Sequence, residues 1–572
     1  MTEIVHKPAG RFRIVTVLTL VLAVPVALTI RAFDLHVTDK KFLQAQGDAR
    51  ALRNIPLAAH RGMILDRNGE PLAVSTPVDT IWADPQQFSV TPTQLKKLAR
   101  MLDLKAGQIS EAVNKQKLKN KEFVFLKRRI NPTLAEKVMA LDIPGISSRR
   151  EYRRYYPTSE VSGHILGFTN IDDLGQEGIE LAYDSWLKGT DGSQVVVKDR
   201  LGRVIKSLSM TKRPQPGKDL VLSVDRRLQY LTYRELKRAV FKHKAKSGSA
   251  VVLDTQTGEI LAMANQPSFN PNNRGDYKGY RYRNRVVTDS FEPGSTVKPF
   301  TILAGLESKK FRPNTVIDTT PGYMKVGPNT IRDIRNYGRI TLANIIHKSS
   351  NVGASKIALA IKPEKLTEMH SRIGFGDVTQ SGLPGEVTGS LHQPRVWRDI
   401  ERATLSYGYG LSTNTLQLAR AYMVLASDGM LKPVTIERQS GLVEGERIAS
   451  DKYVRQVRKM LQGVITEGGT GMKASVPGYH VAGKTGTVKK LGKNGYSDDK
   501  YVSTFVGIAP VSNPRLVMAI TIHEPRGKHY YGGEVAAPVF SNVVAGALRL
   551  LEVSPDDIPA KQVNFALLGG AQ

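Results

Sequence analysis

The sequence predicts an α+β protein with one apolar N-terminal helix, and three observations support that prediction. A stretch without any charged residue spans residues 14–30. Strand and helix patterns occur near residue 220 and again after residue 468, on either side of a mainly helical part. Helices and strands segregated in this way are typical of α+β domains. A chain of 572 residues with 41% apolar composition has room for two to four domains and at least one large core.

Residues 14–30 predict a membrane helix, because 17 uncharged residues approach the length needed to cross a bilayer. A cleaved signal peptide is the alternative, but its apolar part is usually shorter, and residues 31–34 offer no clear small-residue cleavage site. Three basic residues precede the stretch: Lys7, Arg11 and Arg13. They predict that residues 1–13 are cytoplasmic and that the chain after residue 30 lies outside.

The charge is strongly positive, with 82 basic against 52 acidic residues and a net charge of +30. Such a balance raises nucleic acid as a partner, but the predicted topology places the basic body outside the cytoplasm, so we expect none. Attraction to anionic lipids and wall polymers, or solubility alone, explains the charge equally well. The chain has no cysteine, and His523-Glu524 lacks the second histidine of a zinc helix, so we expect no metal and no other cofactor.

Residues 34–213 predict a first extracytoplasmic region of short strands and basic helices. It offers no pair of nucleophile and base. Four residues there could form an acid/base set, but turn and ion-pair roles suit single charged residues better: His60, Asp66, Glu177 and Glu180.

A second domain follows the Pro-Gly-rich segment 214–218. The patterns predict a strand at 220–224, a helix at 226–241, a hairpin of 250–254 with 259–264, three strands around 479–487, 502–508 and 516–523, and a closing helix at 535–551.

The segment Phe291–Phe300 carries the first chemical motif, with Ser295 three residues before Lys298 at a Pro-Gly corner. A helix starting there would place both on one face, within hydrogen-bond reach. A serine nucleophile needs a neighbouring base to take its proton. A lysine can act as that base only if its pKa is lowered. The same spacing occurs in polar surroundings at Ser209–Lys212 and Ser497–Lys500, so chance is the alternative.

Two further motifs follow in order. Ser349-Ser350-Asn351 lies 54 residues beyond Ser295, and Lys484-Thr485-Gly486-Thr487 lies 135 residues beyond Ser349. Taken separately, the first could be a polar helix surface and the second a solvated strand end. Ser-x-x-Lys, Ser-x-Asn and Lys-Thr-Gly in this order are the motif series of serine penicillin-binding proteins and β-lactamases.

With this series the chain resembles the class B penicillin-binding proteins, most closely the division-specific D,D-transpeptidases of Gram-negative bacteria, which are penicillin-binding protein 3-like. The resemblance extends to residues 61–69, 175–180 and 407–410. It implies an elongated noncatalytic pedestal at 34–213 that contacts partners or dimerises, and a penicillin-recognising transpeptidase domain at 217–555. That domain would have an antiparallel sheet with flanking helices and a mainly helical subdomain, followed by a tail at 556–572.

The resemblance also implies site residues. Four would be catalytic: Ser295, Lys298, Ser349 and Asn351. Four would bind the substrate carboxylate: Lys484, Thr485, Gly486 and Thr487. Backbone N–H groups of Ser295 and Thr487 would hold the oxyanion.

The function implied is cross-linking of peptidoglycan stem peptides during septal wall synthesis, with β-lactams acylating the same serine. The partners implied are divisome proteins, including a membrane glycan polymerase, and the location is the inner membrane with the catalytic domain in the periplasm. A D,D-carboxypeptidase or β-lactamase-type hydrolase, or a noncatalytic β-lactam sensor or division scaffold, is the alternative. Between the predicted anchor and the pedestal there is no room for a glycan-polymerising domain, so we do not expect a bifunctional class A protein.

Overall fold

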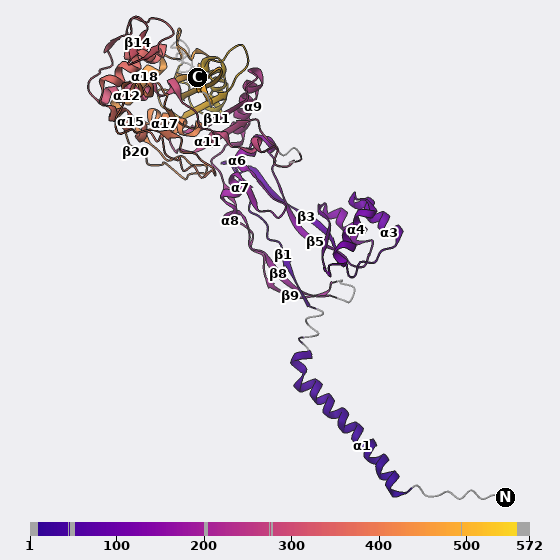
Figure 1. Ribbon diagram of the computed structural model, residues 1–572. Coiled ribbons are helices and arrows are strands. Elements are labelled where there is room, and N and C mark those ends of the chain that lie inside the picture. Colours follow the sequence, from indigo (N-terminus) through magenta and orange to yellow (C-terminus); the bar gives the residue numbers. More distant parts are fainter. Residues whose placement is uncertain are drawn as a thin grey trace, which may run out of the picture. The chain divides into compact units, whose positions relative to one another are not determined.

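The computed structural model describes residues 10–43, 45, 52–198, 204–273, 275, 278–492 and 495–557 (Figure 1). The chain forms two compact units. Unit 1 comprises residues 1–60, 77–153 and 189–216, and unit 2 comprises residues 61–76, 154–188 and 217–572.

Unit 1 begins with helix α1 (Arg11–Phe33), which contains the predicted stretch 14–30 and continues into a π-helical turn, η1 (Asp34–Thr38). Within the described residues it is the one helix long and apolar enough to cross a membrane. The hydroxyls of three threonines donate to the carbonyl four residues earlier, which satisfies them without water: Thr16, Thr19 and Thr29.

Two further parts of unit 1 contain strands. Strands β1 (Leu52–Leu57), β8 (Gly192–Lys198) and β9 (Val204–Lys212) form an antiparallel sheet in the order β1-β8-β9. The other part packs three helices against three strands, of which residues 71–76 of β3 and 154–155 of β5 belong to unit 2: α3 (Pro92–Leu102), α4 (Ala106–Lys117), α5 (Pro132–Met139), β3 (Pro71–Ala83), β4 (Val124–Ile130) and β5 (Ile146–Tyr155). The expectation of short strands was wrong for β3 and β5, which have 13 and 10 residues.

Unit 2 contains short elements from the first half of the chain. They are β2 (Ile64–Leu65), η2 (Ser159–Val161), α6 (Gly163–Leu166), β6 (Phe168–Thr169), β7 (Gly175–Glu177), α7 (Gly178–Ala182) and α8 (Asp184–Leu187). The strand predicted at 220–224 is only β10 (Leu220–Val221), and it pairs in parallel with β2 instead of joining the central sheet.

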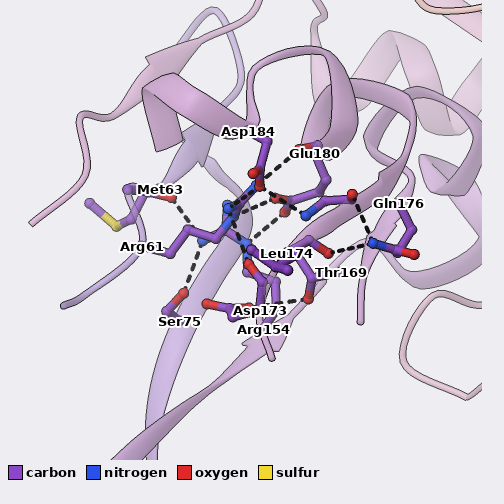
Figure 2. A network of polar contacts seen from close by, with 12 residues as sticks. Arg61, Met63, Ser75, Arg154, Thr169, Asp173, Leu174, Gln176, Glu180 and Asp184 are labelled. Atoms are coloured by element: carbon purple, nitrogen blue, oxygen red, sulfur yellow. Dashed lines mark hydrogen bonds and ion pairs between the residues drawn. The ribbon is translucent and has the colours of Figure 1, made fainter. Parts of the chain in front are cut away.

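A buried network of ion pairs joins α7 and α8 to Arg61 and Arg154 (Figure 2). Glu180 accepts from Arg61 Nε at 2.7 Å and from Arg154 Nε at 2.6 Å, and Arg61 Nη1 reaches Asp184 at 2.7 Å. Burial alone would lower the pKa of Arg61, but the charges and hydrogen bonds of Glu180 and Asp184 raise it. The predicted ion-pair role of Glu180 is therefore confirmed.

The central sheet of unit 2 is antiparallel, in the order β12-β11-β23-β22-β21. Its strands are β11 (Ser247–Asp254), β12 (Ile260–Gln266), β21 (Ala482–Gly492), β22 (Gly495–Ala509) and β23 (Leu516–His523). Helices α9 (Arg226–Lys242) and α20 (Ala537–Leu550) share one hydrophobic core with the sheet, and the short α19 (Gly532–Val535) precedes α20. The predicted hairpin, three strands and two helices are confirmed, and β21 lies at one edge.

The middle of unit 2 is mainly helical, as expected, and shares the larger core with the sheet. Its helices are α10 (Gly279–Tyr282), α11 (Arg285–Thr288), η3 (Gly294–Val297), α12 (Lys298–Glu307), α13 (Leu342–Lys348), α14 (Asn351–Ala360), α15 (Pro363–Arg372), α16 (Asp399–Leu405), α17 (Thr415–Ala426), α18 (Asp451–Gln462) and η4 (Met472–Ala474). In Figure 1, α17 lies beside β11, against which it packs.

Small hairpins interrupt these helices. The paired strands are β13 (Val316–Asp318) with β16 (Arg339–Thr341), β14 (Tyr323–Val326) with β15 (Asn329–Arg332), β17 (Ser390–Leu391) with β18 (Leu411–Ser412), and β19 (Met430–Leu431) with β20 (Glu446–Arg447). The predicted α+β class, with an antiparallel sheet and a mainly helical subdomain, is confirmed.

Candidate active site

Ser295 lies in the 3₁₀ turn η3, and α12 begins only at Lys298. The prediction of one continuous helix was therefore wrong at its first turn. Gly294 has a φ of 55°, and its N–H donates to Gly408 O at 3.1 Å. In the described part of the chain the half-buried Ser295 hydroxyl makes no hydrogen bond, so the predicted direct contact with Lys298 is absent.

The Lys298 amine is fully buried and points to the second motif instead. Nζ donates to Ser349 O at 2.5 Å, to Asn351 Oδ1 at 2.7 Å and to Ser349 Oγ at 3.2 Å. Its pKa is lowered well below the ordinary lysine value, first by burial and then by the charge of Lys484, while Asp333 opposes the shift. Loss of the proton is thus favoured at this amine.

Ser349 and Asn351 lie at the junction between α13 and α14. Ser349 ends α13 with a φ of 60°, a left-handed conformation that is uncommon outside glycine. Ser350 caps α14, because its hydroxyl oxygen accepts from Gly353 N at 2.9 Å. The sharp turn directs the Ser349 carbonyl and the Asn351 amide oxygen to the same amine.

Asp333 supports this junction and was not predicted. Its Oδ1 accepts from the backbone N–H of Asn351 at 2.5 Å and of Val352 at 3.0 Å, and its Oδ2 accepts from the Ser350 hydroxyl at 2.6 Å. A carboxylate is favoured at a helix N-terminus. No spacing rule could have identified it, because it lies in a loop 18 residues before Asn351.

Lys484 approaches from β21 and is also fully buried. Its Nζ donates to Ser349 Oγ at 3.0 Å, so the Ser349 hydroxyl contacts both amines. Burial lowers the pKa of Lys484 to about 7. At neutral pH this amine is therefore divided between its charged and neutral forms.

Direct packing holds β21 beside the Ser295 turn. A Cβ added to Gly486 would lie 3.0 Å from Thr296 Cγ2 and 3.1 Å from Pro293 O, and one added to Gly294 would lie 2.4 Å from Val488 Cγ2. An added Cβ would therefore clash at Gly294, which also has a left-handed φ, and would be crowded at Gly486. Because β21 is an edge strand, the backbone groups on its outer side face away from β22.

The two threonines of the third motif have partners outside the lysine cluster. Thr485 Oγ1 contacts Thr470 Oγ1 at 2.9 Å, and Thr487 Oγ1 accepts from Gly532 N at 2.9 Å. The structure thus joins Lys298, Ser349, Asn351 and Lys484 by direct hydrogen bonds. It brings Gly486 against the Ser295 turn, and both threonines bond to residues outside this cluster.

Glu292 is a second residue that the sequence did not identify. Its Oε1 accepts from Gly410 N at 3.0 Å and from the Tyr496 hydroxyl at 2.9 Å. The segment before Ser295 is thereby fixed to the Tyr407–Gly410 motif and to the β21–β22 hairpin.

The chemistry available here is that of a serine acyltransferase. A serine lies on a turn beside a buried amine with a lowered pKa, and a second hydroxyl bridges that amine to another. A neutral amine can accept the proton of a hydroxyl nucleophile.

Comparison with known proteins agrees with this class. Residues 248–545 match the penicillin binding protein transpeptidase domain, and residues 56–222 match the penicillin-binding protein dimerisation domain. The chain belongs to the penicillin-binding protein family. It is 42% identical over 547 residues to the probable peptidoglycan D,D-transpeptidase PbpC of Pseudomonas aeruginosa, covering 96% of each chain. It is 44% identical over 535 residues to the peptidoglycan D,D-transpeptidase FtsI of Escherichia coli K12, covering 93% of this chain and 90% of FtsI.

Two of the solved structures that resemble this chain are penicillin-binding proteins. The apo transpeptidase domain of penicillin-binding protein 3 from Burkholderia pseudomallei is 44% identical with a TM-score of 0.55, covering 59% of this chain and 98% of that one. Penicillin-binding protein 3 from Mycobacterium tuberculosis, complexed with aztreonam, is 27% identical with a TM-score of 0.68, covering 88% of this chain and 98% of that one.

Proposed function

We propose that this protein is a peptidoglycan D,D-transpeptidase that cross-links stem peptides through a serine acyl-enzyme, and that β-lactams acylate the same serine. The observation that carries the proposal is the convergence of two buried lysines on one hydroxyl, beside a serine turn packed against β21. The relatives PbpC and FtsI are named as D,D-transpeptidases, which supports this reaction over others.

Acylation begins at Ser295. Its oxygen attacks the carbonyl between the two terminal D-alanines, and its proton passes to the Lys298 amine, whose lowered pKa favours the free base. The oxyanion accepts from the backbone N–H groups of Ser295 and Thr487. Ser349 donates its proton to the departing amine, regains one from the lysines it contacts, and D-alanine leaves.

Substrate binding uses the third motif. A peptide extended along the outer edge of β21 gains main-chain hydrogen bonds there. Its terminal carboxylate meets Lys484, and the approaching negative charge favours the ammonium form of an amine whose pKa is about 7. The hydroxyls of Thr485 and Thr487 direct the carboxylate.

The second half-reaction resolves the ester. An amine of a neighbouring stem peptide attacks the acyl carbonyl, Ser295 regains a proton as the leaving group, and the new amide is the cross-link. A β-lactam enters the first step in the same way, because its ring amide takes the place of the D-alanyl amide.

Membrane anchoring, domain roles and partners are part of the same proposal. Helix α1 supports a single-pass anchor in the inner membrane, with residues 1–13 cytoplasmic, a pedestal at 34–213 and the catalytic domain at 217–555 in the periplasm. The likeness to FtsI supports a place at the division septum, with divisome partners that include a membrane glycan polymerase.

The test combines labelling with product analysis on the full-length protein in detergent. Fluorescent penicillin should label wild type covalently, and Ser295→Ala should abolish the label. Ser497→Ala is the matched control, since Ser497 also precedes a lysine by three residues, and it should label fully. Label retained on folded Ser295→Ala would refute the proposed nucleophile.

Product analysis separates the alternatives. With lipid-linked substrate and a glycan polymerase, a transpeptidase yields cross-linked dimers with release of D-alanine. Release without dimers indicates a carboxypeptidase, rapid loss of bound penicillin indicates a β-lactamase, and stable label with neither product indicates a sensor.

A further inference from the structure

Unit 1 has a cluster of three aromatic rings, the half-buried Trp82 and the exposed Phe123 and Phe125, which we call the aromatic patch. Trp82 and Phe123 have ring centroids 4.8 Å apart, and Phe123 meets Phe125 edge to face at 4.6 Å. Phe123 and Phe125 are 40% and 42% exposed. Large rings gathered on a surface in this way are typical of protein-binding sites.

The patch lies on the sheet face opposite the core of this part of unit 1. Ile81 and Ala83 of β3 belong to that core, and Val124 and Leu126 of β4 pack against it. Since neighbouring residues of a strand point to opposite faces, Trp82 and Phe125 point away from the core, and they are cross-strand partners. The rings therefore do not complete the core.

The patch continues to a free strand edge. Strand β4 lies at the end of its sheet and pairs only with β3 in the part of the chain that the structure describes. An unpaired edge offers N–H and C=O groups to an incoming strand. Proteins usually protect such edges with charged residues, whereas here Phe125 is exposed in the first half of the edge and Phe123 directly before it.

The charge around the patch is positive. Residues 77–153 contain fifteen basic and eight acidic residues. Lys127 pairs with the core residue Ile81 beyond a register shift, so it does not lie on the face of Phe125, and it has no ion pair among the described residues. The guanidinium carbon of Arg128 lies 4.8 Å from the centroid of the Phe125 ring. A complementary partner would therefore be acidic.

We propose that the β4 edge and the aromatic patch bind an extended acidic segment of another protein. The segment adds as a strand beside β4, places apolar side chains on Trp82 and Phe125, and places a carboxylate near Lys127. A second copy of this chain fits less well, because pairing β4 with itself would bring two Lys127–Arg129 runs into one interface.

The first experiment uses the full-length protein in detergent and a fluorescein-labelled nine-residue peptide of alternating glutamate and valine. The same peptide with lysine in place of glutamate is the reference. Fluorescence anisotropy should show saturable binding of the glutamate peptide only, weakened by salt. Hydrogen exchange should slow at the backbone amides of β4 when this peptide is bound.

Two substitutions localise the binding. Phe125→Ser should weaken it by about tenfold, the loss expected for one aromatic contact, whereas Phe241→Ser removes another exposed ring, in unit 2, and should have no effect. Lys127→Glu should reverse the preference toward the lysine peptide, whereas Lys96→Glu on α3 should not.

Reversal of preference is a gain of binding, so misfolding cannot imitate it. The proposal is overturned if the glutamate peptide does not bind saturably, if both peptides bind equally, or if the two β4 variants behave like their controls. It is also overturned if sedimentation shows a dimer of this chain that Phe125→Ser dissociates.

Discussion

Arg61 and Arg154 are buried in unit 2 almost as completely as Lys298 and Lys484, yet the two pairs of cations have different surroundings. The arginines are 2% and 5% exposed, and both lysines are 0% exposed. Both arginines contact the carboxylate of Glu180, and Arg61 also contacts Asp184 (Figure 2). The lysine amines contact hydroxyl, amide and carbonyl oxygens instead.

The pKa values follow from these contacts. Carboxylates raise the pKa of Arg61, whereas burial beside neutral oxygens lowers the pKa of both lysines. A compensated cation keeps its proton and holds segments together. An uncompensated amine gives up its proton and can act as a base, which is how perturbed groups at active sites usually arise.

Replacing Lys298 by arginine should produce the largest effect. Lys298→Arg keeps the positive charge but introduces a group that does not lose its proton. The second-order rate of penicillin acylation should fall at least about a hundredfold. Circular dichroism checks the fold, and a rate within about threefold of wild type would contradict the lysine-base mechanism.

Removing the charge of Glu180 should act on stability rather than chemistry. Glu180→Gln leaves two buried arginines short of a carboxylate, which should destabilise the fold by about 3 kcal/mol. Thermal unfolding measures this, with Glu70→Gln as the control, because its pair with Arg226 is exposed. The acylation rate per folded molecule should stay near the wild-type rate. A large loss of that rate would contradict the separation between a structural arginine cluster and a catalytic lysine cluster.

The pH dependence of stability should reveal Lys484. Its pKa is about 7 in the folded protein and about 10.4 in an unfolded chain, so the unfolded state binds more protons between these values. Raising the pH from 7 to 9 should stabilise wild type relative to Lys484→Met by about 2 kcal/mol. Between pH 5 and 6 the stabilities of wild type and Lys484→Met should change with pH in the same way. If they also change in parallel from pH 7 to 9, the pKa of Lys484 is that of an ordinary lysine.

Neutralising Asp333 should have the smallest effect. Asp333→Asn keeps an oxygen for the α14 N–H groups, so it should cost about 1 kcal/mol in stability. Because the Asp333 charge opposes the shift at Lys298, its loss should lower the pKa of Lys298 further and move the acidic limb of the acylation profile to lower pH. Asp451→Asn, half exposed at the start of α18, should leave the profile unchanged. If the acidic limb moves to higher pH instead, the group that titrates there is not Lys298.

Much of the sheet and of the catalytic cluster could be predicted because their signals are local. Runs such as β11 and β23 are apolar on both faces, and the three motifs retain their order and spacing in the chain. The exact conformation at Ser295 could not be predicted, because a Pro-Gly corner before an apolar run suits a 3₁₀ turn as well as an α-helix.

Other features depend on contacts between distant residues. Asp333 reaches a helix start 18 residues away, and β5 is a long strand although its sequence is mostly polar and basic. The preference of Lys298 for Ser349 over Ser295 depends on the left-handed turn at Ser349, which no residue type there indicates.

Among the described residues no carboxylate contacts the Lys484 amine, and this has a consequence for inhibitors. A ligand with a free carboxylate brings an anion to this amine, and a charge-assisted hydrogen bond forms in a buried setting. A β-lactam whose carboxylate is masked as an ester offers no such anion. Esterified prodrugs should therefore acylate this protein slowly until the ester is removed, whatever the reactivity of their ring.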